Sequence, residues 1–233
     1  MERLGAGASR LLWAAALFAA LLVVVGCTAE LLAWDGFPAK FRLDRELAFP
    51  AWYASILMAA TGGLAWWVGA VETGLDRRGA LGWRLLGILF VYFSADEMVG
   101  IHENIADGLG SLPNPGGLLT FRWVVVGIPL VALAGALFLP FLRRLPRRTA
   151  IALVIAGLVF VVGAIGMEML GGAAYTLAGR KRTVLYIALM TMEEALEYLG
   201  VLLAMRAMLK HVASLVPTLQ PFATSAANAS NSG

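Results

Sequence analysis

The sequence predicts an all-α protein, a polytopic transmembrane helical bundle of about six spanning helices. The residues AVILMFWYC make up 60% of its 233 positions, charged residues make up 14%, and the mean hydropathy is +0.80. The apolar residues form continuous runs of roughly 20, which is the length of a spanning helix. Because the bilayer core offers no hydrogen-bond partners, such runs cross it as helices. The predicted spans are Leu11–Trp34, Ala51–Ala70, Leu81–Ile101, Leu118–Phe141, Ala150–Gly171 and Val184–Met208.

The distribution of Lys and Arg predicts how the helices are oriented. The net charge of +3 does not indicate nucleic-acid binding, because the basic residues lie in the segments between apolar runs. With the N-terminus inside, more of them fall on the inner side, and "RRLPRR" at residues 143–148 is the strongest inner anchor. We therefore expect a multi-pass protein of the inner (cytoplasmic) membrane with both termini in the cytoplasm.

The sequence predicts a single transmembrane domain that includes the first apolar run and is followed by a C-terminal tail. Cys27 ends "VVGC", which resembles a lipoprotein cleavage site, but the apolar run continues through "LLAW" and favours an ordinary first helix. Pro50 suits the start of the second helix. The end of the chain is small and polar. We expect one transmembrane domain over residues 1–212 and a flexible tail over residues 213–233.

The third, fifth and sixth predicted spans contain acidic residues. Each ionised carboxylate at mid-bilayer costs about 2.5–3.5 kcal/mol on insertion scales. No Lys or Arg lies in the middle of a span, and Arg122, at the start of the fourth, is the one basic residue expected near the acids. The carboxylates therefore require protons, metal cations or a water-filled cavity. The candidates are Asp96, Glu97, Glu168, Glu193, Glu194 and Glu197, with His102 and Glu103 at the outer end of the third span.

Helix geometry predicts that these acids meet in the central or outer half of the membrane. On the expected topology the third and fifth helices run outward and the sixth runs inward. Glu193, Glu194 and Glu197 share one face of the sixth helix. On a continuous third helix, Asp96 and Glu103 share a face.

Carboxylates from several helices, together with an imidazole, bind pairs of iron or manganese ions inside helical bundles, and zinc accepts the same ligands. The soluble di-iron pattern has Glu-x-x-His on two helices, whereas here His102 is the single nearby histidine and follows Glu97 by five residues. We expect a divalent metal cofactor (iron, manganese or zinc). Its expected ligands are Asp96, Glu97, His102, Glu103, Glu168, Glu193, Glu194 and Glu197.

Several blocks of the chain resemble a family of uncharacterised bacterial multi-pass membrane proteins. These blocks are "LDRELAFPAWYAS", "FSADEMVGIHE", "LPRR", "GAIGMEMLGG" and "EEALEYLG", and they cover most of residues 40–205. The resemblance implies a bacterial membrane protein and no particular activity. Ceramidase-like membrane hydrolases also hold zinc between helices, but they use several histidines.

Three functions fit the sequence. The first is a membrane-embedded metal site that acts on a lipid or quinone-like substrate, by oxidation with iron or hydrolysis with zinc. The second is a proton- or cation-coupled transporter, favoured by a weak inverted repeat between Ser94–Glu97 and Thr191–Glu194. The third is a non-catalytic assembly subunit. The lipid bilayer is the expected partner in each case, and protein partners are left open.

Overall fold

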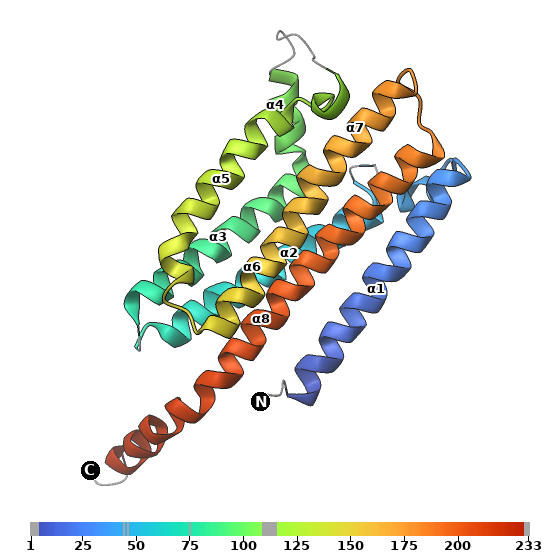
Figure 1. The fold of residues 1–233 in the computed structure, drawn as a ribbon. Helices are drawn as coiled ribbons and strands as arrows, with labels where there is room; N and C mark the ends of the chain where they lie inside the picture. Colours follow the sequence, from blue (N-terminus) through green and yellow to red (C-terminus); the bar gives the residue numbers. More distant parts are fainter. Residues whose placement is uncertain (1–4, 44, 46, 75, 109–115, 231–233) are drawn as a thin grey trace.

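The computed structural model describes residues 5–43, 45, 47–74, 76–108 and 116–230; for residues 106, 107 and 216–230 only the backbone is described. Every regular element among these residues is helical (Figure 1). The elements are α1 (Ala6–Leu31), η1 (Phe37–Phe41), α2 (Phe49–Glu72), α3 (Arg77–Val99), α4 (Ile101–Gly108), η2 (Gly117–Leu119), α5 (Trp123–Leu142), α6 (Arg147–Val161), the π-helical segment η3 (Val162–Met167), α7 (Glu168–Leu177) and α8 (Val184–Ser230).

Within the described part of the chain, four helical segments are long and apolar enough to cross a membrane: α1, α2, α5 and the continuous helix formed by α6, η3 and α7. They expose large apolar side chains, such as Leu17 on α1, which is 68% exposed, and Leu137 on α5, which is 69% exposed. Helices α3 and α8 have the length to span but contain five of the seven acids of the predicted site. The all-helical membrane fold is therefore confirmed, while the predicted count of six spans is not.

Small residues allow α2 and α3 to pack closely. A Cβ atom on Gly62 would lie 2.9 Å from the carbonyl oxygen of Gly87, and one on Gly87 would lie 2.8 Å from that of Gly62. Near the other end of the pair, a Cβ on Gly69 would lie 2.8 Å from the carbonyl oxygen of Ala80. Such contacts are typical of helix pairs in membranes, where close approach replaces the hydrophobic effect as the driving force.

Helix α8 contacts α1, α2, α6, η3 and α7, so it is the central helix of the bundle. Its Gly200 lies against Phe160 of α6, and Gly163 of η3 lies against Glu193 of α8. The spacing of Gly157, Gly163 and Gly166 in the sequence is typical of close helix packing. The structure has such a contact at Gly163, whereas an added Cβ on Gly157 would meet nothing within 4 Å and one on Gly166 would meet only Val162 of the same helical segment.

Both ends of the described chain lie at the same end of the bundle, opposite α4 and the end of α7 (Figure 1). Helix α8 continues beyond the predicted span to Ser230, through the segment expected to be a tail. Residues 231–233 lie outside the described part. The flexibility of residues 213–233 stays a prediction.

A buried polar pair joins α2 and α8 near the end that carries the termini. His211 is 2% exposed, and its Nε2 is hydrogen-bonded to Oε1 of Glu72, which is 7% exposed. Its Nδ1 lies 3.3 Å from Oγ1 of Thr149 on α6, and its ring lies 5.1 Å from the ring of Trp83 on α3. The sequence places His211 beyond the last span, where solvation is expected. That expectation is wrong, because α8 keeps the residue inside the bundle.

At the opposite end of the bundle, a buried cluster of charged side chains joins two of the connections between helices. Glu30 at the end of α1 is 4% exposed, and its Oε2 lies 2.8 Å from guanidinium nitrogens of both Arg42 and Arg182. The two arginines come from the α1–α2 and α7–α8 connections. Glu30 thus has two basic partners.

Candidate functional site

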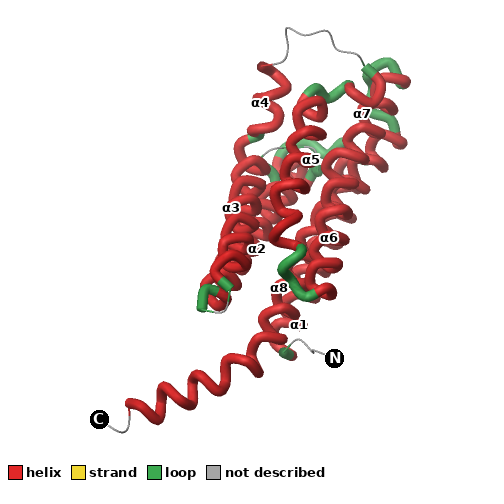
Figure 2. Tube along the Cα trace, turned by 60° about the vertical axis from the view of Figure 1, so that its left-hand side comes forward, coloured by secondary structure: helices red, strands yellow, loops and turns green. Residues whose placement is uncertain are grey.

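One cavity of about 1240 Å³ is lined by all eight residues that the sequence predicts as metal ligands. It lies beside α5, which contacts α3, α4 and η3 and has few buried residues of its own. Figure 2 shows α5 between the α3–α4 side and the α6–α7 side of the bundle. The loose packing of α5 leaves room for the cavity. The eight residues are Asp96, Glu97, His102, Glu103, Glu168, Glu193, Glu194 and Glu197.

Asp96 and His102 form the outer corner of this site. Helix α3 ends at Val99, because Gly100 adopts a left-handed conformation with φ of 58°. The sequence predicts a helix that continues through Ile101, so this boundary is a correction, and glycine is the residue that tolerates such a turn. The turn brings His102 back onto Asp96. The backbone N–H of His102 donates to Oδ1 at 2.8 Å, and Nδ1 lies 2.9 Å from Oδ2.

His102 lies on α4, outside the spanning helices. Burial lowers the pKa of its imidazole, whereas the hydrogen bond and the charge of Asp96 raise it, and overall the pKa is raised. Glu103 and Glu168 contribute in the same direction. Glu103 itself is exposed at the edge of the cavity. The outer corner thus combines one imidazole with carboxylates from α3, α4 and α7.

Glu168 is the first residue of α7, directly after the π-helical segment η3. Such segments alter the helix register and are frequent at functional sites. Oε1 of Glu168 accepts a hydrogen bond of 3.0 Å from Nε1 of Trp123. The Trp123 ring also lies 5.1 Å from the His102 ring, in an edge-on arrangement. Trp123 therefore connects the outer corner to the acids farther along the cavity.

Helix α8 supplies the inner acids of the cluster. The side chain of Glu193 lies close enough to that of Glu168 for the two carboxyl groups to interact. Glu197 is half-buried and lies close enough to Glu97 of α3 to interact with it electrostatically. Glu194 also lies close to Glu197. The acids that the sequence places on three different helices therefore come together.

Four acids of the site have no Lys or Arg partner among the described residues. In the part of the chain that the structure describes, no Lys or Arg forms an ion pair with Glu97, Glu168, Glu193 or Glu197. In that same part, no three His, Cys, Asp or Glu side chains are placed so that they could hold a metal ion together. The acids are therefore grouped around one cavity and linked in pairs, without forming a coordination shell.

Trp123 is the site residue that the sequence interpretation missed. Its position at the start of an apolar run is typical of a tryptophan at the membrane interface, and nothing in the sequence indicates that its indole faces Glu168. Arg122, which the sequence predicts near the acids, does line the same cavity. Tyr198, predicted as bundle core, is 3% exposed and donates to the carbonyl oxygen of Pro50 at 3.0 Å.

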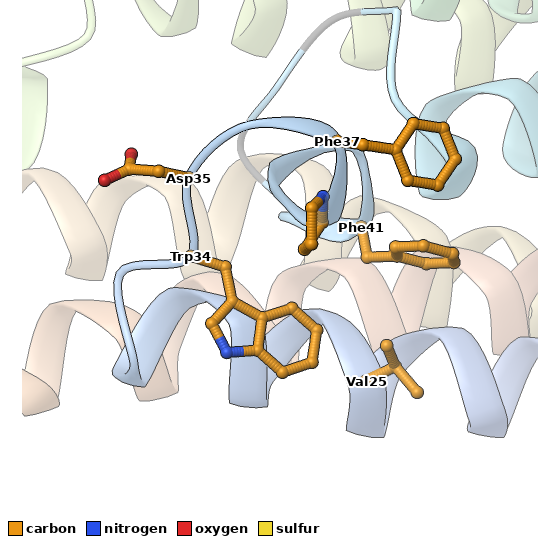
Figure 3. Close-up of a pocket in the computed structure, with 6 residues that line it drawn as sticks. Val25, Trp34, Asp35, Phe37 and Phe41 are labelled. Carbon is orange, nitrogen blue, oxygen red and sulfur yellow. The ribbon is translucent and has the colours of Figure 1, made fainter.

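A smaller cavity of about 360 Å³ lies against the end of α1 (Figure 3). It is lined by Val25, Trp34, Asp35, Phe37, Pro38 and Phe41. Asp35 is its one ionisable lining residue. This aromatic hollow contains none of the predicted ligands, so the larger cavity is the candidate site.

Comparison with known proteins places the chain in a family. The model of a domain of unknown function, DUF8692, matches residues 8–212. No curated protein and no solved structure matches the chain. The match covers every residue of the acidic cluster and ends where the predicted transmembrane domain ends. Because it spans most of the 233 residues, the chain belongs to the DUF8692 family, in agreement with the predicted membership of an uncharacterised family.

Proposed function

We propose that the chain is a multi-pass inner-membrane protein that binds a divalent metal ion (iron, manganese or zinc) at its acidic cluster. Its termini lie in the cytoplasm, and the cluster lies in the outer half of the bilayer, as the distribution of basic residues favours. The protein acts at this site on a lipid or quinone-like substrate. The apolar walls of the cavity support a substrate of that kind.

The observation that carries the proposal is the grouping of Glu97, Glu168, Glu193 and Glu197 around one cavity, without an ion pair to Lys or Arg among the described residues. Four carboxylates at membrane depth cost several kcal/mol each unless cations or protons accompany them. Elsewhere in this chain a buried acid does have basic partners, as Glu30 shows. Glu97, Glu168, Glu193 and Glu197 are therefore distinguished by having none among the described residues.

The donor set fits iron, manganese or zinc, because it is rich in carboxylate oxygen and includes one imidazole. In the described residues these side chains are not placed to hold an ion together, so Glu97, Glu168, Glu193 and Glu197 would have to converge on it. Carboxyl groups that bind the ion would have to lose any proton they hold. A bound metal ion would polarise a substrate oxygen or activate water. Trp123 fixes the position of Glu168 through its indole N–H.

Elemental analysis tests this function. Protein purified from metal-replete cells is expected to carry near-stoichiometric iron, manganese or zinc. The double variant Glu193→Gln/Glu197→Gln is expected to lose most of it, because two carboxylate donors become weakly coordinating amides. Asp35→Asn, which removes an exposed acid outside the cluster, is the matched control and should retain the metal. Metal-free wild-type protein would refute the proposal.

The closeness of the Glu168 and Glu193 carboxyl groups favours a second function, proton-coupled transport. Carboxyl groups that share a proton are the usual elements of proton relays in membrane proteins. From His102, a series of neighbouring groups leads through Glu168 and Glu193 to Glu197. This series runs from the outer corner of the cavity to its buried end.

Proton flux into liposomes tests the second function. Under an imposed pH gradient, an internal pH indicator is expected to report faster acidification with the wild-type protein than with Glu193→Gln, which cannot release a proton. Asp35→Asn should match the wild type. Equal flux in Glu193→Gln and wild type would exclude these carboxyl groups as the coupling groups. Protein with neither metal nor flux would leave the assembly subunit as the function.

A further inference from the structure

The large cavity has two chemically distinct parts. Its polar part contains the acidic cluster, Trp123 and Arg122, and its apolar part extends along α3, α5 and α6. On α5 the lining residues run from Trp123 to Leu142, which corresponds to about 28 Å of helix. The hydrocarbon core of a bilayer is about 30 Å thick. The cavity is thus long enough for an extended hydrocarbon chain.

We infer that this cavity binds a lipid with an anionic, phosphate-type head group, which Arg122 contacts while the hydrocarbon chain lies along α5. The inference rests on the proposed function and narrows its substrate class. A neutral quinone ring would also fit the apolar walls, so the head group distinguishes the two classes of ligand.

Arg122 is the basis for the anionic head group. Its Nε is buried and has no hydrogen-bond partner among the described residues. The residue lines the same cavity as seven acidic side chains, yet it pairs with none of them in the described residues. An arginine that served only to neutralise the acids would contact at least one. A guanidinium group binds phosphate oxygens through two parallel N–H donors, so a phosphate would supply the partner that Nε lacks.

The surrounding charges are compatible with a lipid phosphate. Arg45 is exposed and lines the same cavity, which adds a second cation. The carboxylates would repel a phosphate on their own. The proposed metal ion would offset that repulsion, because hard cations bind carboxylate and phosphate oxygens together. Trp123 is already hydrogen-bonded to Glu168, which leaves Arg122 as the donor available at the start of α5.

Dodecyl phosphate and dodecanol are suitable probes, because they share a chain and differ in head group. Binding of each to the full chain, purified in a maltoside detergent, can be measured by isothermal titration calorimetry. The wild type is expected to bind dodecyl phosphate more tightly than dodecanol. Arg122→Gln is expected to weaken dodecyl phosphate binding by about 10-fold or more and to leave dodecanol unchanged. Arg143→Gln, at an exposed arginine outside the cavity, is the matched control.

The apolar part of the site is tested separately. Gly157→Phe places a ring where no atom lies within 4 Å of an added Cβ, and Gly135→Phe does so from α5. Both glycines line the cavity, so each variant should weaken both probes. Equal binding of dodecanol and dodecyl phosphate, or unchanged phosphate binding in Arg122→Gln, would overturn the inference. The metal content of the same preparations is measured in parallel, so a failure of the metal proposal is recognised independently.

Discussion

Replacing Glu72 by alanine is expected to lower the free energy of unfolding by about 1–3 kcal/mol, the usual cost of leaving a buried polar group without its hydrogen-bond partner. Glu72 is 7% exposed and is hydrogen-bonded to Nε2 of His211, which is 2% exposed. Without the carboxylate, the imidazole would lie against Trp83 with no partner at that nitrogen. His211→Ala should be similarly destabilising. Unfolding by SDS titration in mixed micelles measures both.

Thr149→Val is the control for this pair, because it removes a weaker contact of the same histidine. It removes a neutral contact of 3.3 Å to Nδ1 of His211, for which about 1 kcal/mol is expected. The double variant Glu72→Ala/His211→Ala should lose less than the sum of the single variants, because both remove the same interaction. A cost for Glu72→Ala no larger than that for Thr149→Val would show that the pair does not hold α2 and α8 together.

The membrane fold could be predicted from the sequence because apolar runs have a length set by the bilayer. The helices α1, α2 and α5 could be predicted from their apolar runs alone, without knowledge of tertiary contacts. The Glu72–His211 pair could not be predicted in the same way. Both residues lie beyond the apolar runs, Glu72 at the end of α2 and His211 within α8, and are 139 positions apart. Their burial depends on how α8 crosses the bundle, which hydropathy does not encode.

The residues of the candidate site could be predicted, but their pairing could not. Acids in apolar runs are conspicuous, and all eight predicted residues line one cavity. On a continuous helix, Asp96 and His102 would point about 120° apart. The left-handed conformation of Gly100 brings them together, and a lone Gly in an apolar run does not predict it. The contact between Glu168 and Glu193 likewise depends on the π-helical segment η3 and on the packing of α7 against α8.

Replacing Gly200 by leucine is expected to separate α6 from α8 and to destabilise the bundle by about 3 kcal/mol or more, at the upper end of overpacking costs. A Cβ on Gly200 would lie 2.7–2.9 Å from Cβ, N and Cα of Phe160. Two of these atoms belong to the backbone, so no side-chain rotation can make room. The midpoint of thermal unfolding in detergent measures the effect.

The same substitution also tests whether the acidic cluster depends on the α6–α8 contact. Gly163 of η3 lies against Glu193 and Glu197 at the same interface, so moving α8 away would separate Glu193 from Glu168. We therefore expect Gly200→Leu to lose bound metal along with stability. Gly157→Leu is the matched control on α6, because an added Cβ there meets nothing within 4 Å. If Gly200→Leu melted at the wild-type temperature and kept its metal, the close approach of α6 and α8 would not be what positions the acids.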